Sequence, residues 1–249
     1  MDLDFDPKQN VSSFDRLYTP FNIPKNLHHL KYELFYKPFK KLEMASLPGF
    51  TSDQNTISFD YKGKKVVFTK KLLTEQQLMN TKNEIFFGNE YSKFQTSNRA
   101  IIDIGAFDGD TAILFTLNGA KYVFGYELEG DIVAIAKENI RLNTLQNKIS
   151  VKEGAVNNLD DVIGEISASY PNERFSLKMD VEGAEYSILL KCSDKSLESI
   201  DQIIMEYHYG YLNLFNRFTK LGFKVQVSRP HRAMQGKGFE GILYAWRSA

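Results

Sequence analysis

From residue 100 onward, short apolar runs alternate with segments of helical periodicity. Each run has the length of a buried strand, and the segments between them repeat apolar side chains every three or four residues, as one face of a helix does. Strands that alternate with helices form a mostly parallel sheet covered on both faces. We therefore predict an α/β domain with seven strands, at residues 100–104, 122–128, 149–156, 175–181, 203–208, 224–228 and 242–246. The last two are joined by a non-helical loop and should form an antiparallel hairpin at the sheet edge.

The first 95 residues have a different pattern. Residues 1–55 are rich in aromatic side chains but contain five prolines, which interrupt helices. We predict an irregular helical appendage, whose aromatic side chains either dock on the main domain or form a wall of the substrate pocket. Residues 56–69 contain two β-rich runs separated by Lys62-Gly63-Lys64, which predicts a hairpin, and a helix with Leu72, Leu73, Leu78 and Met79 should follow. The predicted parts are thus an appendage (1–55), a hairpin and helix (56–95) and the main domain (96–249).

Composition and charge narrow the class of protein. With 43% hydrophobic residues the chain can build a sizeable core, and a formal net charge of zero gives no overall field that would attract nucleic acid or an anionic membrane. The single cysteine, Cys192, cannot form an internal disulfide and is expected to be buried. The acidic start without an apolar segment, and the absence of a run of about 18 apolar residues, predict neither an export signal nor a membrane span. We therefore expect a cytoplasmic protein.

The most informative motif follows the first predicted strand and reads Asp-Ile-Gly-Ala-Phe-Asp-Gly-Asp over residues 103–110. It occupies the first strand-to-helix turn, at the edge where open α/β sheets bind ligands. Gly105 allows the backbone to approach a ligand, and Gly109 lets the next helix start close to the sheet. The pattern is not the G-x-G-x-x-G turn that binds a pyrophosphate. Asp103, Asp108 and Asp110 would repel phosphate but attract a sulfonium or ammonium group, so the turn indicates a cationic ligand.

A glutamate at the end of the second predicted strand completes this site. Glu127 follows the glycines by about 20 residues, where an acidic side chain can accept hydrogen bonds from both ribose hydroxyls. A ribose together with a cation indicates S-adenosylmethionine rather than a nicotinamide dinucleotide. The alternative is a ligand-free turn that needs its glycines only for shape. The predicted cofactor-binding residues are Asp103, Gly105, Ala106, Phe107, Asp108, Gly109, Glu127, Leu128, Ala155 and Asp180.

These motifs together resemble the FkbM-type methyltransferase family. The resemblance rests on residues 103–106, on Glu127, on Leu-Lys-Met-Asp-Val-Glu-Gly-Ala-Glu at 177–185 and on Ile-Met-Glu-Tyr-His at 204–208. It covers about residues 57–249, and it departs from the family at Phe107, where a small or polar residue is common. The resemblance implies a Rossmann-like class I methyltransferase core, a seven-stranded mostly parallel sheet with an antiparallel edge hairpin. It also implies methyl transfer from S-adenosylmethionine to a hydroxyl oxygen of a sugar or other small metabolite.

Methyl transfer to oxygen requires aligned reactants and removal of the hydroxyl proton. Asp180 is predicted to position the substrate or accept the proton, and His208 is predicted as general base because its side chain titrates near neutral pH. Glu206 would orient His208 or bind substrate, and Glu182, on the same side of the strand end as Asp180, would bind substrate. Glu185 is expected either in the site or as a helix-dipole partner. A divalent metal on Asp180, Glu206 and His208 is the alternative; because histidine is a poor Mg²⁺ ligand, we predict no metal.

The acceptor itself is less determined. Arg229 and Arg232, in the loop before the last strand, are predicted to grip an anionic substrate, although a solvated basic loop explains them too. The expected partner is a small hydroxylated molecule. Two alternatives stay open: an RNA or other macromolecule methyltransferase with the same core, and a cofactor-binding module without catalysis. The segment after the fourth strand lacks the [ND]-P-P-[YFW] motif of adenine-methylating enzymes, and the neutral charge argues against nucleic acid.

Overall fold

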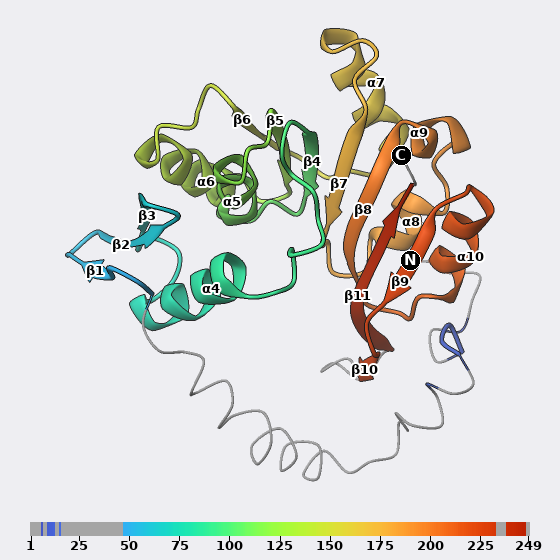
Figure 1. The fold of residues 1–249 in the computed structure, drawn as a ribbon, viewed down its shortest axis with the longest axis horizontal. Coiled ribbons are helices and arrows are strands. Elements are labelled where there is room, and N and C mark those ends of the chain that lie inside the picture. Colours follow the sequence, from blue (N-terminus) through green and yellow to red (C-terminus); the bar gives the residue numbers. More distant parts are fainter. Residues whose placement is uncertain (1–5, 7–8, 13–14, 16–46, 233–237, 248–249) are drawn as a thin grey trace.

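The computed structural model describes residues 6, 9–12, 15, 47–232 and 238–247, which contain two β-sheets (Figure 1). The small sheet has the strands β1 (Thr51–Ser52), β2 (Thr56–Tyr61) and β3 (Lys64–Thr69). The large sheet forms the centre of the fold. Its strands are β4 (Ala100–Ile104), β5 (Tyr122–Glu127), β6 (Ile149–Glu153), β7 (Phe175–Met179), β8 (Ile200–Tyr207), β9 (Lys224–Val227), β10 (His231–Arg232) and β11 (Phe239–Trp246).

The large sheet is parallel from β4 to β8 and antiparallel at one edge. Its order is β6-β5-β4-β7-β8-β11, with β9 and β10 each paired to β11. Strand β11 runs antiparallel to both β8 and β9. The direction of winding reverses between β4 and β7, so the turns after these two strands lie side by side. This is the class I methyltransferase fold, and the predicted sheet with its antiparallel edge is confirmed; the two-residue strand β10 is an addition.

Helices cover both faces of the large sheet (Figure 1). One face carries α4 (Glu75–Phe87), α5 (Asp110–Leu117) and α6 (Gly130–Leu142), and the other carries α7 (Leu159–Ser169), α8 (Glu185–Leu189), α9 (Asp194–Glu198) and α10 (Leu212–Lys220). Successive side chains of β4 point to opposite faces of the sheet. Ile101 packs in the hydrophobic cluster with α5 and α6, and Ile102 packs in the cluster with α7 and α8. Because both faces are covered, the strands appear in the sequence as continuous apolar runs. Within the described part of the chain, no helix has the length and apolarity needed to cross a membrane.

The hairpin of β2 and β3 is bound tightly to the main domain. The hairpin forms where the sequence predicts it, and its two-residue turn, Lys62-Gly63, has positive φ at both positions. The open edge of β3 is paired by side-chain amides of α6: the Val67 N–H donates to Asn143 Oδ1 at 3.0 Å, and the Thr69 N–H to Asn139 Oδ1 at 2.9 Å. Asn139 also donates to the Asp108 carbonyl oxygen at 2.9 Å. One buried asparagine therefore links the hairpin to the turn after β4.

Most of the predicted N-terminal appendage, residues 16–46, lies outside the described residues. The described part docks where β8 leads into α10. The Asn10 carbonyl oxygen accepts from the Tyr211 N–H at 2.8 Å. The Asn10 side chain donates to the Tyr209 carbonyl oxygen at 3.0 Å and accepts from the Asn213 N–H at 2.8 Å. At this point the segment packs on the main domain through Asn10; most of the aromatic side chains whose role the sequence left open lie outside the described residues.

Cys192 is buried just beyond α8, as predicted, and burial raises the pKa of its thiol to about 11. The thiolate is the reactive form of cysteine. At mildly alkaline pH the folded protein should therefore react with an aromatic disulfide reagent at least about 100-fold more slowly than the denatured protein, whose cysteine pKa is about 8.5. Absorbance of the released thiol measures both rates. Equal rates would show that the thiol is accessible in the folded protein, against its observed burial.

Candidate cofactor and active site

The turn after β4 bends sharply beside the end of β5. The N–H groups of Gly105 and Ala106 both donate to the Tyr126 carbonyl oxygen, at 2.9 and 3.0 Å. Gly105 has a φ of 82°, and a Cβ there would collide with the Asp180 carbonyl oxygen. Gly109, with a φ of 84°, precedes the first residue of α5. Both glycines are thus required by backbone conformation, and Gly105 also by the close approach of the turn after β7.

Glu127 is fixed at the mouth of this turn by backbone donors. Its Oε2 accepts from the Phe107 N–H at 3.0 Å, and its Oε1 accepts from the N–H groups of Leu128 and Glu129 at 2.7 and 3.2 Å. A carboxylate has about four acceptor positions, so one remains for a ligand hydroxyl. The side chains of Phe107 and Leu128 are 36% and 64% exposed, which leaves two apolar surfaces beside the carboxylate. Together they provide an acceptor for a ribose and apolar contact for a base.

The aspartates of the turn face inward rather than toward a ligand. Lys82 of α4 donates to both carboxylate oxygens of Asp108, at 2.8 and 2.7 Å, and to Asp110 Oδ2 at 2.7 Å. All three side chains are buried. Burial alone would lower the pKa of Lys82, but the two carboxylates outweigh it and raise the pKa above its ordinary value. Burial and Asp110 raise the pKa of Asp108 to about 6.

A second buried lysine neutralises Asp103. Lys178 Nζ lies 3.1 Å from Asp103 Oδ1 and donates to the Gly105 carbonyl oxygen at 2.7 Å. Thr111 donates to Asp103 Oδ2 at 2.6 Å. Asp103 is fully buried, and burial raises its pKa. The geometry therefore shows Asp103, like the two carboxylates paired with Lys82, holding the turn in shape through buried ion pairs and hydrogen bonds.

Neither lysine was found by sequence reasoning. A signal existed for Lys178, because a lysine within the apolar strand Phe175–Met179 must find a buried partner. No comparable signal marks Lys82, which lies on a helix with many polar residues.

A cluster of charged residues follows β7 and β8. Asp180, Glu182 and His208 each place one oxygen or nitrogen within 4.8 Å of the others. His208 Nε2 lies 3.5 Å from Glu182 Oε2, and its Nδ1 lies 3.0 Å from Glu185 Oε1. Glu185 is fully buried and also accepts from the Val181 N–H at 3.1 Å. The predicted residues Asp180, Glu182 and His208 are therefore brought together, with Glu185 beneath them.

The charges around His208 weaken the argument that made it the predicted general base, which was that its pKa lies near neutral. Burial would lower the pKa of His208, but its hydrogen bond to Glu185 and the charges of Glu185, Glu206 and Asp180 raise it to about 9. The imidazole therefore holds its proton at neutral pH. Burial, with the nearby Asp180, raises the pKa of Glu206 to about 7. By pKa alone, Glu206 is the better proton acceptor.

The remaining predicted site residues are Ala155, Arg229 and Arg232. Ala155 is exposed just beyond β6, next to Gly154, whose N–H donates to the Glu127 carbonyl oxygen at 2.9 Å. Arg229 is exposed, and the side chain of Arg232 is outside the described part. Glu90, which was not predicted as a site residue, lies near Asp180; partial desolvation, with Glu84 and Asp180, raises its pKa.

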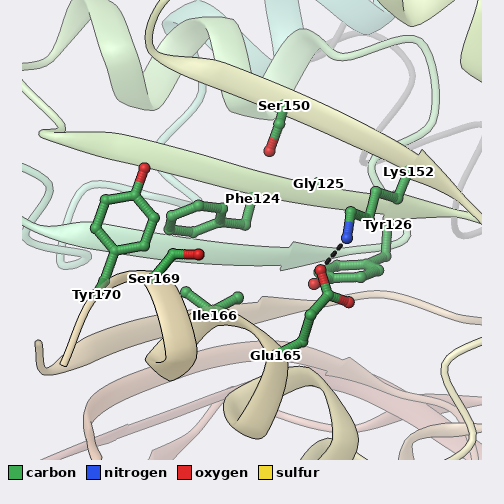
Figure 2. A pocket seen from close by; sticks show the side chains of 9 residues that line it. All are labelled: Phe124, Gly125, Tyr126, Ser150, Lys152, Glu165, Ile166, Ser169 and Tyr170. Carbon is green, nitrogen blue, oxygen red and sulfur yellow. Dashed lines mark hydrogen bonds and ion pairs between the residues drawn. The ribbon is translucent and has the colours of Figure 1, made fainter.

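A separate cavity of about 120 Å³ lies between α7 and the strands β5 and β6 (Figure 2). The aromatic rings of Phe124 and Tyr170 line one end of it, and the ion pair between Lys152 and Glu165 lies at the other. None of the cofactor-turn glycines lines it. The cavity is therefore not part of the candidate site.

Sequence comparisons match one part of the chain. A family model described as ribosomal protein L11 methyltransferase (PrmA) matches residues 89–170. The L11 methyltransferase of Alkaliphilus oremlandii is 33% identical over 76 residues, which are 30% of this chain and 23% of that protein. The enzyme of the same name from Streptococcus equi subsp. zooepidemicus is 43% identical over 54 residues, 22% of this chain and 17% of that protein. The matched part of the chain thus spans about a sixth to a quarter of the length of these relatives.

Among solved structures, M. capricolum TrmK in complex with S-adenosyl-homocysteine aligns with a TM-score of 0.47 and 14% identity, over 64% of this chain and 67% of that one. The segment matched by the family model runs from before β4 to just past α7. It includes the turn after β4 and Glu127. It ends before Asp180 and His208. The similarity is therefore to the half of the fold that contains the candidate cofactor site.

Two expectations from the sequence are wrong. The resemblance to the FkbM-type family is overturned, because the matching family model is that of the L11 methyltransferases. The expectation of a small hydroxylated acceptor is overturned with it, because these relatives are named for a ribosomal protein. The predicted enzyme class, a methyltransferase, and S-adenosylmethionine as its cofactor agree with the same matches.

Proposed function

We propose that this protein is an S-adenosylmethionine-dependent methyltransferase that modifies a protein. The observation that carries the proposal is Glu127: three backbone N–H groups fix its carboxylate beside a glycine turn at the winding reversal of the sheet. The remaining acceptor position suits a ribose hydroxyl. The exposed Phe107 and Leu128 suit an adenine, and the absence of a Cβ at Gly105 lets the turns after β4 and β7 lie against each other at this edge of the sheet.

The residues after β7 and β8 would act on the acceptor. S-adenosylmethionine supplies a methyl group on a sulfonium centre that is open to in-line attack. The enzyme's part is to align the acceptor with that group and to take up its proton. The carbonyl oxygen of Asp180 lies beside Gly105 of the cofactor turn, and the carboxylate of Asp180 is the proposed group that orients the acceptor. Glu206 is the proposed proton acceptor.

A protein acceptor follows from two considerations. The relatives that match the cofactor half are named for a ribosomal protein. The zero net charge also gives no general attraction to RNA, whose binding proteins draw much of their affinity from positive charge. To test the acceptor, the enzyme and methyl-labelled S-adenosylmethionine would be incubated with ribosomal proteins or with ribosomal and transfer RNA. Label in protease-sensitive material supports the proposal, and label only in RNA would replace the protein acceptor by an RNA.

The cofactor is tested by substitution of Glu127. Calorimetric titration should show binding of S-adenosylhomocysteine, and Glu127→Ala should weaken it by about 1–3 kcal/mol, the range for a lost hydrogen bond in a buried polar site. Glu138→Ala is the control. Glu138 lies on α6 and pairs with Lys71, so its substitution should leave the affinity for S-adenosylhomocysteine unchanged. If neither S-adenosylmethionine nor S-adenosylhomocysteine binds the wild type, the methyltransferase proposal fails.

A further inference from the structure

The cluster after β7 and β8 has the donor set of a transition-metal site. Asp180 and Glu182 contribute carboxylate oxygens and His208 contributes a ring nitrogen, all within 4.8 Å of one another. Bond lengths of about 2.0–2.2 Å place two ligand atoms of a tetrahedral zinc site about 3.4 Å apart. His208 Nε2 and Glu182 Oε2 already lie 3.5 Å apart, and the Glu182 side chain is 84% exposed, so buried packing does not hold it in place.

Glu185 supplies an independent indication. Metal-binding histidines commonly direct their second ring nitrogen at a carboxylate, which fixes the ring and its tautomer. Here the fully buried Glu185 accepts from His208 Nδ1 at 3.0 Å, so Nε2 is the nitrogen that faces Glu182. The other Glu185 oxygen, Oε2, is buried and has no hydrogen-bond partner among the described residues. A buried carboxylate with an unsatisfied oxygen, next to the imidazole, indicates that the cluster lacks positive charge.

The charges around the cluster also favour the binding of a cation. Asp180, Glu182, Glu185 and Glu206 surround one imidazole. Lys178 is the nearby lysine, but its ammonium group already contacts Asp103 and the Gly105 carbonyl oxygen. The described side chains of the cluster therefore carry more negative than positive charge, and a divalent cation would balance them.

We propose that Asp180, Glu182 and His208 bind one divalent cation of borderline softness, Zn²⁺ or Mn²⁺, which would displace the proton from His208 Nε2 on binding, with Glu185 positioning the histidine. One nitrogen and two carboxylate oxygens suit these ions better than Mg²⁺, which prefers oxygen alone. Three protein ligands would leave at least one coordination position open for water or another ligand. The site differs from the set considered from the sequence, in that Glu182 replaces Glu206.

The test uses Glu182→Gln, because this exposed side chain can be changed without disturbing the core. Metal-stripped full-length protein is titrated with ZnCl₂ by calorimetry and with MnCl₂ by the loss of the free-ion EPR signal. The wild type should bind one equivalent of at least one ion with micromolar affinity, and Glu182→Gln should bind it at least tenfold more weakly. Glu198→Gln, an exposed glutamate on α9, is the matched control and should bind as the wild type does.

Two results would overturn the proposal: no binding of either ion by the wild type, or equal binding by wild type and Glu182→Gln. The second would mean that other residues hold the ion. His208→Gln, with its fold verified by circular dichroism, should show the same loss as Glu182→Gln. Because Glu182 lies outside the proposed cofactor contacts, Glu182→Gln should still bind S-adenosylhomocysteine. Failure of the metal site is thus distinguishable from failure of the proposed cofactor site.

Discussion

Replacement of Lys82 by methionine is expected to lower the free energy of unfolding by about 3–5 kcal/mol, the cost of leaving buried charges without their partner. Methionine fills a similar volume beside the Phe68 ring, so the loss of charge is the main change. Asp108 and Asp110 would remain buried without a counter-ion. Chemical denaturation measures the effect. S-adenosylhomocysteine affinity should fall as well, because these aspartates shape the cofactor turn.

The pH dependence of stability distinguishes the loss of the buried ion pairs in Lys82→Met from a loss of packing. Without Lys82 the pKa of Asp108, already about 6, should rise further. A carboxyl group whose pKa is higher in the folded state binds protons more tightly there, so stability falls as pH rises toward that pKa. The destabilisation should therefore be smaller near pH 5 than near pH 8. Lys71→Met, which removes an exposed pair with Glu138, should cost about 1 kcal/mol or less. A Lys82→Met effect no larger than this control would contradict the buried network.

Substitution of Gly105 by alanine should abolish measurable cofactor binding. The residue has a φ of 82°, which costs an L-residue about 1–2 kcal/mol, and the added Cβ would collide with the Asp180 carbonyl oxygen. Backbone cannot move aside as the end of a long side chain can, so the turns after β4 and β7 must separate. We expect a loss of more than about 2 kcal/mol in stability and at least a 100-fold loss in S-adenosylhomocysteine affinity, or about 2.7 kcal/mol.

Gly164→Ala is the matched control for this change. Gly164 lies within α7, and a Cβ there would meet no atom within 4 Å. Alanine favours helices over glycine by up to about 1 kcal/mol, so this variant should be as stable as the wild type or more so. Both variants would be compared by thermal unfolding and calorimetry. Wild-type cofactor affinity in Gly105→Ala would mean that the turn is not the cofactor site.

The cofactor turn depends on residues outside the segment that resembles the L11 methyltransferases. Lys82 precedes that segment and Lys178 follows it, and both hold the turn through buried ion pairs. The hairpin reaches the same turn through Asn139. The hairpin and α4 also share a hydrophobic cluster with α5 and α6, so residues 56–95 pack together with the elements that carry the turn.

The sequence by itself predicted the order of elements well, because buried parallel strands and amphipathic helices leave strong local patterns. It placed the strands correctly but extended several of them too far. Leu128, Val181 and His208 lie just beyond the ends of β5, β7 and β8. These ends are where the candidate site forms, since loops there leave the hydrogen-bonded sheet. The helix α4 also begins later than its apolar pattern suggests, at Glu75, because Thr74 caps it.

The glycine turn and Glu127 were predictable for the same reason: both follow from the spacing within one strand-turn-helix unit and the next strand. The pairing of charges was decided by the tertiary structure alone. Lys82, on α4, pairs with Asp108 in the turn after β4, 26 residues later in the chain. His208, just after β8, pairs with Glu185 at the start of α8. Glu182 lies 3.5 Å from His208 Nε2, and its backbone has a positive φ of 53°. Such contacts depend on how separate elements are placed in space, and no local pattern of residue types records that placement.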